Sequence, residues 1–175
     1  DQWIGNSYNI KPEIADQLSV GFVQGWKNNT YELSTELYYK NLQNQLDYKD
    51  GAEIFTLADV ESALLFGVGR AYGLELLWKK KEGVLTGWVS YTLSKTERKI
   101  NGINQNNWYN AKQDRTHDIA VVGVYTLNSR WSISSVFVYN TGNAVTFPTG
   151  KYSIQGQTLY QYASRNGNRM PSNHR

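Results

Sequence analysis

The chain of 175 residues has no cysteine, one methionine and only two histidines, His117 and His174. Without cysteine there are no disulfides and no thiolate metal sites, although the redox compartment stays open. Two isolated histidines do not indicate a metal site, and we expect no cofactor. No apolar run approaches the roughly 20 residues of a membrane-spanning helix. The composition therefore argues against a disulfide scaffold, a metal centre and a helical membrane protein.

A dense patch of positive charge is also missing. The 18 Lys and Arg residues against 15 Asp and Glu residues give a net charge of +3, and the cations are spread through predicted turns and loops. Nucleic-acid binding usually needs a dense basic stripe. We therefore expect no nucleic-acid partner.

The sequence is rich in aromatic residues, with 13 Tyr and 6 Trp beside 15 Gly, a mixture that favours strands over helices. Apolar and polar residues alternate with a period of two, which predicts strands. Six strands are predicted, at residues 17–26, 31–40, 72–79, 88–94, 119–127 and 131–139. Five of them have a mainly apolar face, whereas the fifth, at 119–127, is apolar on both faces and cannot be oriented.

The connections between these strands alternate between short and long. Three short polar turns are predicted at 27–29, 81–83 and 128–130, and three long loops at 41–69, 95–116 and 140–171. Short turns thus gather at one end and long loops at the other. Outer-membrane barrels have this asymmetry, with short periplasmic turns and long extracellular loops, and their strands need only about 9–11 residues each.

Aromatic residues mark both ends of the apolar faces, as they do at the two interfaces of a membrane barrel. The predicted interfacial girdle consists of Trp26, Tyr31, Trp78 and Trp131 beside the short turns, and of Tyr39, Tyr72 and Tyr139 beside the long loops. Eight residues separate the two belts on a strand, or about 26 Å. A tilt of about 40° reduces this to about 20 Å, comparable with the apolar band of a barrel, about 25 Å.

These patterns predict an all-β fold, a section of a transmembrane antiparallel up-and-down β-barrel with about six strands. Residues 1–175 are expected to form a single partial barrel domain, without a plug domain or a closing strand. Six strands cannot close a membrane barrel, because the smallest has eight, so the chain is expected to be part of something larger. The residues after Met170 are expected to enter a seventh strand.

A soluble or cell-surface β-rich binding module, such as a carbohydrate-binding sandwich, is the alternative interpretation. Its core would also show alternating apolar residues. Charged residues opposite the apolar faces, such as Glu36 and Lys40, suit a wet lumen and a solvated surface equally well. The placement of Trp and Tyr, together with the loop asymmetry, favours the membrane barrel.

Several segments resemble TonB-dependent receptors, particularly those of Bacteroidetes-type outer membranes. The segments that carry the resemblance are Ile-Lys-Pro-Glu at 10–13, Gly-Arg-Ala-Tyr-Gly-Leu-Glu-Leu at 69–76, Gly-Trp-Val-Ser-Tyr-Thr-Leu-Ser at 87–94, Gln-Asp-Arg-Thr-His-Asp at 113–118 and Tyr-Asn-Thr-Gly-Asn-Ala at 139–144. Each motif is weak alone, but their order and spacing together are fairly specific.

This resemblance implies a barrel of 22 strands with a plug domain, which takes up a nutrient across the outer membrane of a Gram-negative bacterium. The partners that it implies are the lipid bilayer, the rest of the barrel with its plug, and the TonB complex in the periplasm. A surface lipoprotein is a further candidate partner.

No pattern of residues indicates an enzyme. Glu32, Glu36 and Glu75 could be taken as catalytic acids, but on an inward face we expect them to line a polar lumen and to pair with Lys40 or Lys79. The cluster at 114–118, with Asp114, His117 and Asp118, could suggest a triad or a metal site. No serine or cysteine nucleophile is signalled, so we expect a loop-to-strand junction there.

Long loops on rigid barrels often carry recognition. Trp108 and Tyr109 stand in an Asn-rich part of the second long loop, where they could stack on a sugar or peptide substrate or simply pack the loop. In the first long loop, residues 58–66 have apolar positions at near-helical spacing. We expect a short amphipathic helix there, packed on the barrel rim.

Overall fold

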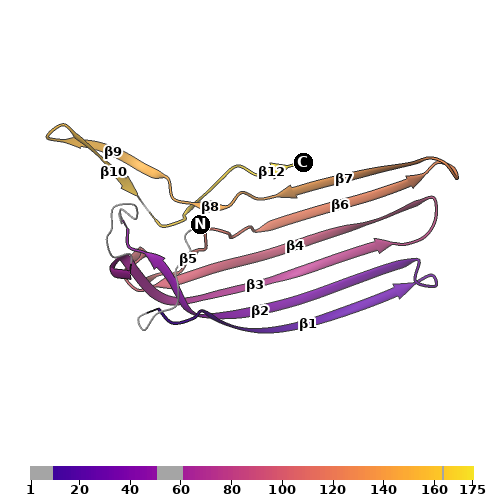
Figure 1. The fold of residues 1–175 in the computed structure, drawn as a ribbon, viewed down its shortest axis with the longest axis horizontal. Helices are drawn as coiled ribbons and strands as arrows, with labels where there is room; N and C mark the ends of the chain where they lie inside the picture. The colour runs from indigo at the N-terminus through magenta and orange to yellow at the C-terminus, as the bar shows by residue number, and fades with distance from the viewer. Residues whose placement is uncertain (1–9, 51–60, 163) are drawn as a thin grey trace.

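The fold is built around one large curved antiparallel sheet, seen in a computed structural model that describes residues 10–50, 61–162 and 164–175. Its six long strands run side by side along the molecule (Figure 1) in the order β1-β2-β3-β4-β6-β7. Their bounds are β1 Ile14–Trp26, β2 Tyr31–Tyr48, β3 Leu64–Lys80, β4 Leu85–Ile100, β6 His117–Thr126 and β7 Ser132–Asn140. The predicted all-β fold with six main strands is confirmed.

Short turns join the strands of each pair at one end of the sheet, on the right in Figure 1. Between β1 and β2, three consecutive residues have positive φ: Lys27 (51°), Asn28 (55°) and Asn29 (65°). Asparagine accepts this left-handed conformation more readily than most residues. The polar Lys-Asn-Asn sequence thus gives a tight turn at the predicted place.

Three strands reach further into the predicted long loops than the sequence pattern indicates. β2 continues to Tyr48, β3 already begins at Leu64, and β4 runs to Ile100. The register between β2 and β3 shifts between Leu42 and Gln45, where a β-bulge changes which face each side chain takes. The bulge interrupts the alternation in β2, so the predicted loop at 41–69 is too long. The predicted loop at 95–116 is also too long, because β4 continues to Ile100 in unbroken register with β3.

The predicted amphipathic helix at 58–66 is wrong for the residues that the structure describes. Residues 61–63 form a single 3-10 turn, η1 (Glu61–Ala63), and 64–66 are the first residues of β3. Residues 58–60 lie outside the described part of the chain. The apolar residues at 64–66 alternate across the faces of the strand, and a window of nine residues cannot separate this pattern from a helical one.

Pairing with its neighbours orients the strand that is apolar on both faces, now β6. Ile119 lies opposite Tyr91 of β4 and opposite Tyr139 of β7, and directly opposed residues in an antiparallel pair share a face. Ile119, Val121 and Tyr125 therefore share the face of the predicted girdle. The alternate residues Ala120, Val122 and Val124 lie on the opposite face.

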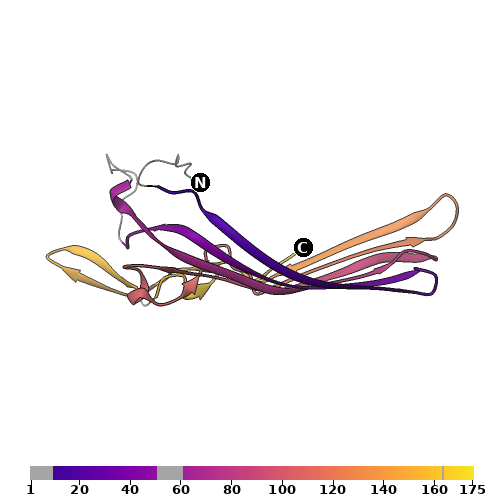
Figure 2. The ribbon, with the colours of Figure 1, turned by 90° about the horizontal axis from the view of Figure 1, so that it is seen from below.

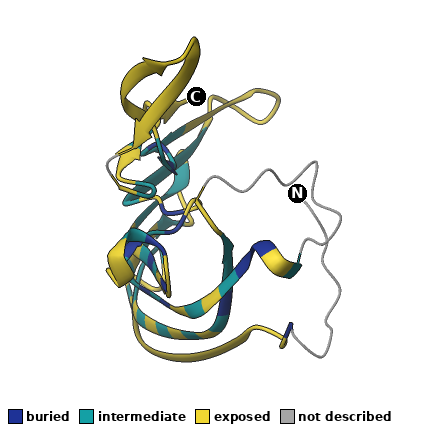
Figure 3. Cartoon of the chain, turned by 90° about the vertical axis from the view of Figure 1, so that its left-hand side faces the viewer, coloured by how far each residue is buried: buried dark blue, intermediate teal, exposed yellow. Residues whose placement is uncertain are grey.

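Except at the ends opposite the short turns, where Leu64 and Ile100 are buried, the long strands have no core of their own. Turned by 90°, the sheet is a single bent layer (Figure 2), and from the loop end the strands follow an open arc (Figure 3). Large apolar side chains of β1, such as Leu18, Val20 and Phe22, are exposed. The sheet must therefore be covered by something outside these residues.

The last part of the chain contains more structure than the predicted loop at 140–171. β8 (Ala144–Val145) pairs with β11 (Asn168–Arg169), and β9 (Pro148–Ile154) forms a hairpin with β10 (Gln157–Tyr162). β12 (Asn173–His174) then pairs with β7, so the predicted entry to a seventh strand is confirmed. Within the described residues, no helix is long and apolar enough to cross a membrane.

Candidate functional site at the loop end

The end of the sheet opposite the short turns gathers most of the buried and polar contacts of the molecule. We call it the loop end and define it as residues 43–50, 61–70, 95–116 and 141–172. It contains the far ends of β2, β3 and β4, the 3-10 turn η2 (Asn104–Asn106), and β5 (Tyr109–Asn110), which pairs with β4. The β9–β10 hairpin projects from it (Figure 1).

A small apolar core anchors the loop that follows β4. Ile100 and Ile103 are fully buried, Tyr109 is almost fully buried, and Leu65 of β3 packs against them. The strands approach closely here, because a Cβ at Gly67 would lie 2.1 Å from the carbonyl oxygen of Lys99. Only glycine fits at that position. The loop end is thus packed like the interior of a soluble protein.

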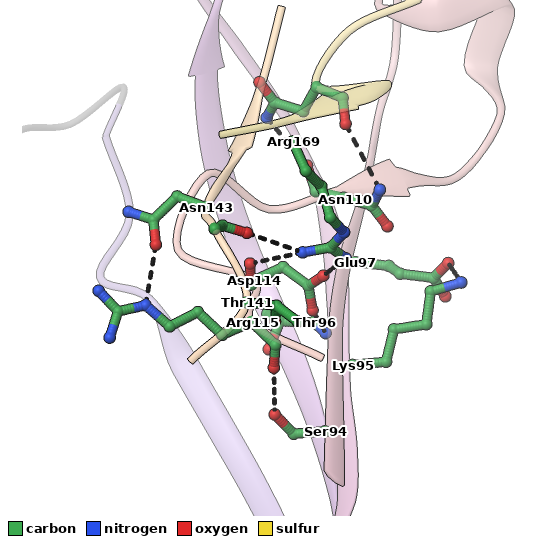
Figure 4. Close-up of polar contacts among 12 residues, drawn as sticks. Ser94, Lys95, Thr96, Glu97, Asn110, Asp114, Arg115, Thr141, Asn143 and Arg169 are labelled. Carbon is green, nitrogen blue, oxygen red and sulfur yellow. Dashed lines mark hydrogen bonds and ion pairs between the residues drawn. The ribbon is translucent and has the colours of Figure 1, made fainter. Parts of the chain in front are cut away.

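A buried ion pair ties two distant loops to β4 (Figure 4). The carboxylate of Asp114 is fully buried, accepts a hydrogen bond from the Thr96 amide at 2.6 Å, and pairs with the guanidinium of Arg169. The same guanidinium donates to the carbonyl oxygens of Asp114 and Gly142, at 3.0 and 3.2 Å. A buried carboxylate needs such partners to stay charged. This network fixes the segment at 168–170 against the strand.

A second polar cluster joins β2 to the loop after β10. Asp47 accepts a hydrogen bond from the Tyr109 hydroxyl at 2.8 Å and pairs with Arg165 at 2.7 Å, and Arg165 also pairs with Asp50 at 2.6 Å. Burial and the Asp47 carboxylate raise the pKa of the Tyr109 phenol, because both favour its neutral, donating form. The two ion pairs of Arg165 connect residues more than 100 positions apart in the sequence.

A third cluster lies where β3 and β4 pass the girdle residues beside the long loops, Tyr39, Tyr72 and Tyr139, which we call the outer belt. Glu97 pairs with Arg70 at 2.7 Å and with Lys95 at 2.8 Å, and the Arg70 guanidinium lies 4.2 Å from the centre of the Trp108 ring. Burial opposes ionisation of Glu97, but the two cations outweigh it, so the pKa of Glu97 lies below its usual value. The cluster holds Trp108 and Arg70 in one fixed stack.

An open cavity of about 730 Å³ lies between the loops of this end. The side chains around it combine charged, amide and apolar groups: Asp50, Asn104, Lys112, Ala144, Val145, Thr146, Tyr162, Ser164, Arg165 and Asn166. Its size falls within the range of small-molecule sites, and such sites typically combine apolar walls with a few fixed polar groups. Asn166 is fixed by hydrogen bonds with Thr146 and Asn110.

Two aromatic residues were predicted as substrate contacts, and the structure places them differently. Trp108 is half-buried and stacks on Arg70, whereas Tyr109 is buried in the apolar core with its hydroxyl on Asp47. Trp108 therefore keeps part of its ring accessible, and Tyr109 packs the loop. A role of either residue in substrate binding stays a prediction.

The residues of the predicted girdle share one face of the sheet. Beside the short turns, Trp26 stacks on Tyr31 at 5.9 Å and Tyr31 on Trp78 at 6.0 Å, and at the other end Tyr39 stacks on Tyr72 at 6.5 Å. Two further members lie on β7 or directly before it: Tyr139 and Trp131. The spacing thus forms two rows of rings, one beside the short turns and one about halfway along β2 and β3.

Of the three acidic residues weighed as catalytic groups, Glu32 has basic partners, whereas Glu36 and Glu75 lie directly opposite each other on β2 and β3. Glu32 lies 3.4 Å from Lys79 and 2.6 Å from Lys81, which includes one of the two pairings expected for it. Lys40 instead lies over the Tyr38 ring. Neighbours such as these are common for charged residues on a solvated face.

The cluster of Asp114, His117 and Asp118 is not brought together. Asp114 binds Arg169, the Nδ1 of His117 lies 2.9 Å from the Tyr91 hydroxyl, and Asp118 follows on the other face of β6. In the described part of the chain, no group of three His, Cys, Asp or Glu side chains could hold a metal ion. The segment is a loop-to-strand junction, as expected.

Several residues of the loop end carry no signal in the sequence. Asp47, Arg165 and Arg169 stand in no motif, and their ion-pair partners are between 55 and 118 positions away. Asp114 alone belongs to a segment that the resemblance had marked, at 113–118. Only the pairing of distant strands brings these charges together.

Comparison with known proteins identifies the family. The sequence model described as TonB dependent receptor-like, beta-barrel matches residues 2–173, which is nearly the whole chain and agrees with the antiparallel sheet. The chain belongs to this family. TonB-dependent receptors are receptors and transporters of the outer membrane of Gram-negative bacteria, and the family is not enzymatic. It also implies contact with TonB and with the rest of the barrel and its plug.

A search of curated proteins returned no match, and neither did a search of solved structures. The family assignment therefore stands on the family model together with the fold.

Proposed function

We propose that this chain is a wall of an outer-membrane receptor that imports a nutrient, with the loop end as part of its substrate-binding region. Residues 1–175 would form a single partial barrel domain of that receptor. The observation that carries the proposal is the cavity of about 730 Å³ among loops that are held by ion pairs. A binding site needs such preorganised loops on a rigid frame.

The girdle residues support a membrane position for the six long strands. Rows of stacked Trp and Tyr rings bound a face of exposed apolar side chains, and aromatic belts mark the two interfaces of membrane barrels. In this position the short turns lie in the periplasm, and the loop end lies outside the cell.

The bacterial type of the receptor, its energy source and its protein partner are proposed from the resemblance. Motifs such as 69–76 and 113–118 favour a receptor of the Bacteroidetes type, with uptake energised through the TonB complex and a surface lipoprotein as a candidate partner. A glycan or peptide substrate would suit the amides and the tyrosine of the cavity wall, Asn104, Asn166 and Tyr162.

The proposal is tested by growth on single nutrients. A strain without the full-length receptor should lose growth on its substrate, and the same loss should follow from removal of TonB. Lys112→Glu, in the wall of the cavity, should weaken uptake, whereas Lys151→Glu on the projecting hairpin should not. Unchanged uptake in the Lys112 variant, or equal loss in both, would contradict the role of the cavity.

A further inference from the structure

A basic cluster lies on the girdle face just beyond the outer belt. In the strand register, Lys95 of β4 lies opposite Tyr72 of β3, and Tyr72 stacks on Tyr39 of that belt. One pleat further along the strands Arg70 lies opposite Glu97, and two pleats further Lys99 lies opposite Val68. Residues two positions apart share a face of a strand, so the three cations and the single carboxylate face the same side as the belt.

The height of the cluster matches the lipid headgroups. Two residues advance about 6.6 Å along a strand, or about 5 Å along the membrane normal at a tilt near 40°. Lys95 therefore lies level with Tyr72, with Arg70 about 5 Å and Lys99 about 10 Å further out. The headgroup layer adds about 5–7 Å on each side of the hydrocarbon core. The cluster spans this layer.

Arg70 is held in one orientation before any ligand arrives. Its Nε and one terminal nitrogen lie 2.8 and 2.7 Å from Glu97, and its guanidinium stacks between the rings of Trp108, at 4.2 Å, and Tyr72, at 5.9 Å. Its other terminal nitrogen has no protein acceptor among the described residues. A fixed guanidinium loses little entropy when it binds a phosphate.

The neighbouring strands β1 and β2 do not share the positive charge of β3 and β4. At the same height on the girdle face, β1 and β2 carry Asp16 opposite Asn41, and Asp16 accepts a hydrogen bond from Gln43 at 2.9 Å. Around Glu97, by contrast, three cations leave an excess of about two charges, which matches the charge of about −1.5 to −2 on a phosphate monoester. This local excess of positive charge would attract an anionic ligand.

A hollow of about 230 Å³ adjoins the cluster, and its lining includes Lys95, Glu97, Trp108, Asn110 and Asn166. It borders the larger cavity, because Ser164, Arg165 and Asn166 line both. The two asparagines are fixed because each side-chain amide donates to the backbone carbonyl oxygen of the other residue. An indole beside amide groups suits a sugar ring rather than a glycerol. Below Lys95, the girdle face is apolar and can accept acyl chains.

We propose that Arg70, Lys95 and Lys99 bind the phosphate of a phosphorylated glycolipid in the outer leaflet of the outer membrane. The inference rests on the membrane position given under Proposed function and adds a lipid to it. Bound in this way, the lipid would brace β3 and β4 at the point where the loop end begins.

The test measures binding of lipid A that carries one phosphate to the purified full-length receptor in detergent, against the same lipid without its phosphate. We expect the phosphorylated form to bind about tenfold more tightly and the preference to shrink as salt is raised. The preference should fall in Arg70→Gln and in Lys99→Gln. Lys99→Gln breaks no ion pair of the described residues, so it keeps the test valid if Arg70→Gln fails to fold.

Lys40→Gln is the matched control, because Lys40 lies opposite Ala71 on the other face of the sheet and its loss removes the same charge. It should leave lipid binding unchanged. Equal affinity for both lipid A forms, or a preference that survives in Lys99→Gln, would overturn the site. Stronger binding of phosphatidylglycerol, or full competition by inorganic phosphate, would overturn the glycolipid assignment. Uptake in cells is scored separately, so a receptor that imports its nutrient without a lipid preference refutes only this inference.

Discussion

The long strands and the loop end of this chain are stabilised in opposite ways. In the strands, Val20 and Leu18 expose 70% and 72% of their surface, and contacts run only between neighbours in one layer. At the loop end, Ile100 and Ile103 are fully buried and buried carboxylates are paired. The loop end therefore follows the rules of a soluble protein, whereas the strands depend on lipid and on further protein to cover them.

This difference shows which part of the fold is stabilised by contacts within the chain and which part depends on its surroundings. The loop end owes its structure to long-range polar contacts that burial makes strong, because an unpaired buried charge is costly. The strands owe theirs to backbone pairing and to the solvent on each face. Substitutions should therefore act through lost partners in one region and through the surrounding medium in the other.

The largest effect is expected from the buried pair of the loop end. Asp114→Ala removes the carboxylate that pairs with Arg169 and leaves the Thr96 amide without its acceptor, which should cost about 3–5 kcal/mol of stability. Thermal unfolding of the full-length receptor, or protease cleavage within its loops, measures the loss. Asp50→Ala removes a carboxylate that is 66% exposed from Arg165 and should cost below about 1 kcal/mol. Similar costs for both would mean that burial does not distinguish this network.

The second-largest effect concerns the stability cost of placing a charge on one face of the sheet or on the other. Phe22 and Val23 are neighbours in β1, and each is 62% exposed, but they lie on opposite faces. Phe22→Arg places a charge near the middle of the girdle face, where lipid contact should cost about 2–4 kcal/mol. Urea unfolding of the full-length receptor in lipid vesicles measures this loss of stability.

Val23→Arg is the matched control on the opposite face, where water or polar protein can solvate the charge. Its cost should stay below about 1 kcal/mol. If Val23→Arg proves as damaging as Phe22→Arg, the two faces share one medium, and the contrast between lipid and lumen fails.

The strands could be predicted from the sequence because alternation is a local property. It found all six, and the tight turn at Lys27, Asn28 and Asn29, since each feature depends on adjacent residues. It could not extend β2 past the bulge at 42–45, because the alternation changes phase there. It could not orient β6 either, since only its pairing with Tyr91 and Tyr139 decides which apolar face is which.

The loop end could be predicted only in part, because its contacts are not local. The aromatic pair Trp108 and Tyr109 stood out as unusual, yet whether each ring packs or stays accessible depends on Asp47 and Arg70. Those partners are 62 and 38 positions away and belong to strands that no motif connects. Charge pairing over such distances follows from strand order, which the sequence pattern does not contain.

A smaller effect is expected when one polar contact of the loop end is removed without a change in packing. Tyr109→Phe keeps the buried ring but removes its hydrogen bond to Asp47, which should cost about 1–2 kcal/mol. Thermal unfolding of the loop end, followed by amide hydrogen exchange around β5, measures it. Tyr160→Phe on the exposed hairpin should change nothing measurable. A silent Tyr109→Phe would show that the apolar core alone holds this loop.

The smallest effect is the pH response of Glu97, whose pKa is lowered in the folded chain because Lys95 and Arg70 outweigh the cost of burial. A carboxyl group with a depressed folded pKa stabilises the structure above its unfolded pKa, near 4.5, and this contribution is lost as the pH falls from there through the folded value. Amide exchange in the segment at 97–110 should therefore accelerate on acidification below about pH 4.5, by an amount worth less than about 1 kcal/mol. The Glu97→Gln variant should exchange faster already at neutral pH and lose this acid-dependent step. Persistence of the full step in that variant would assign it to another carboxylate of the loop end.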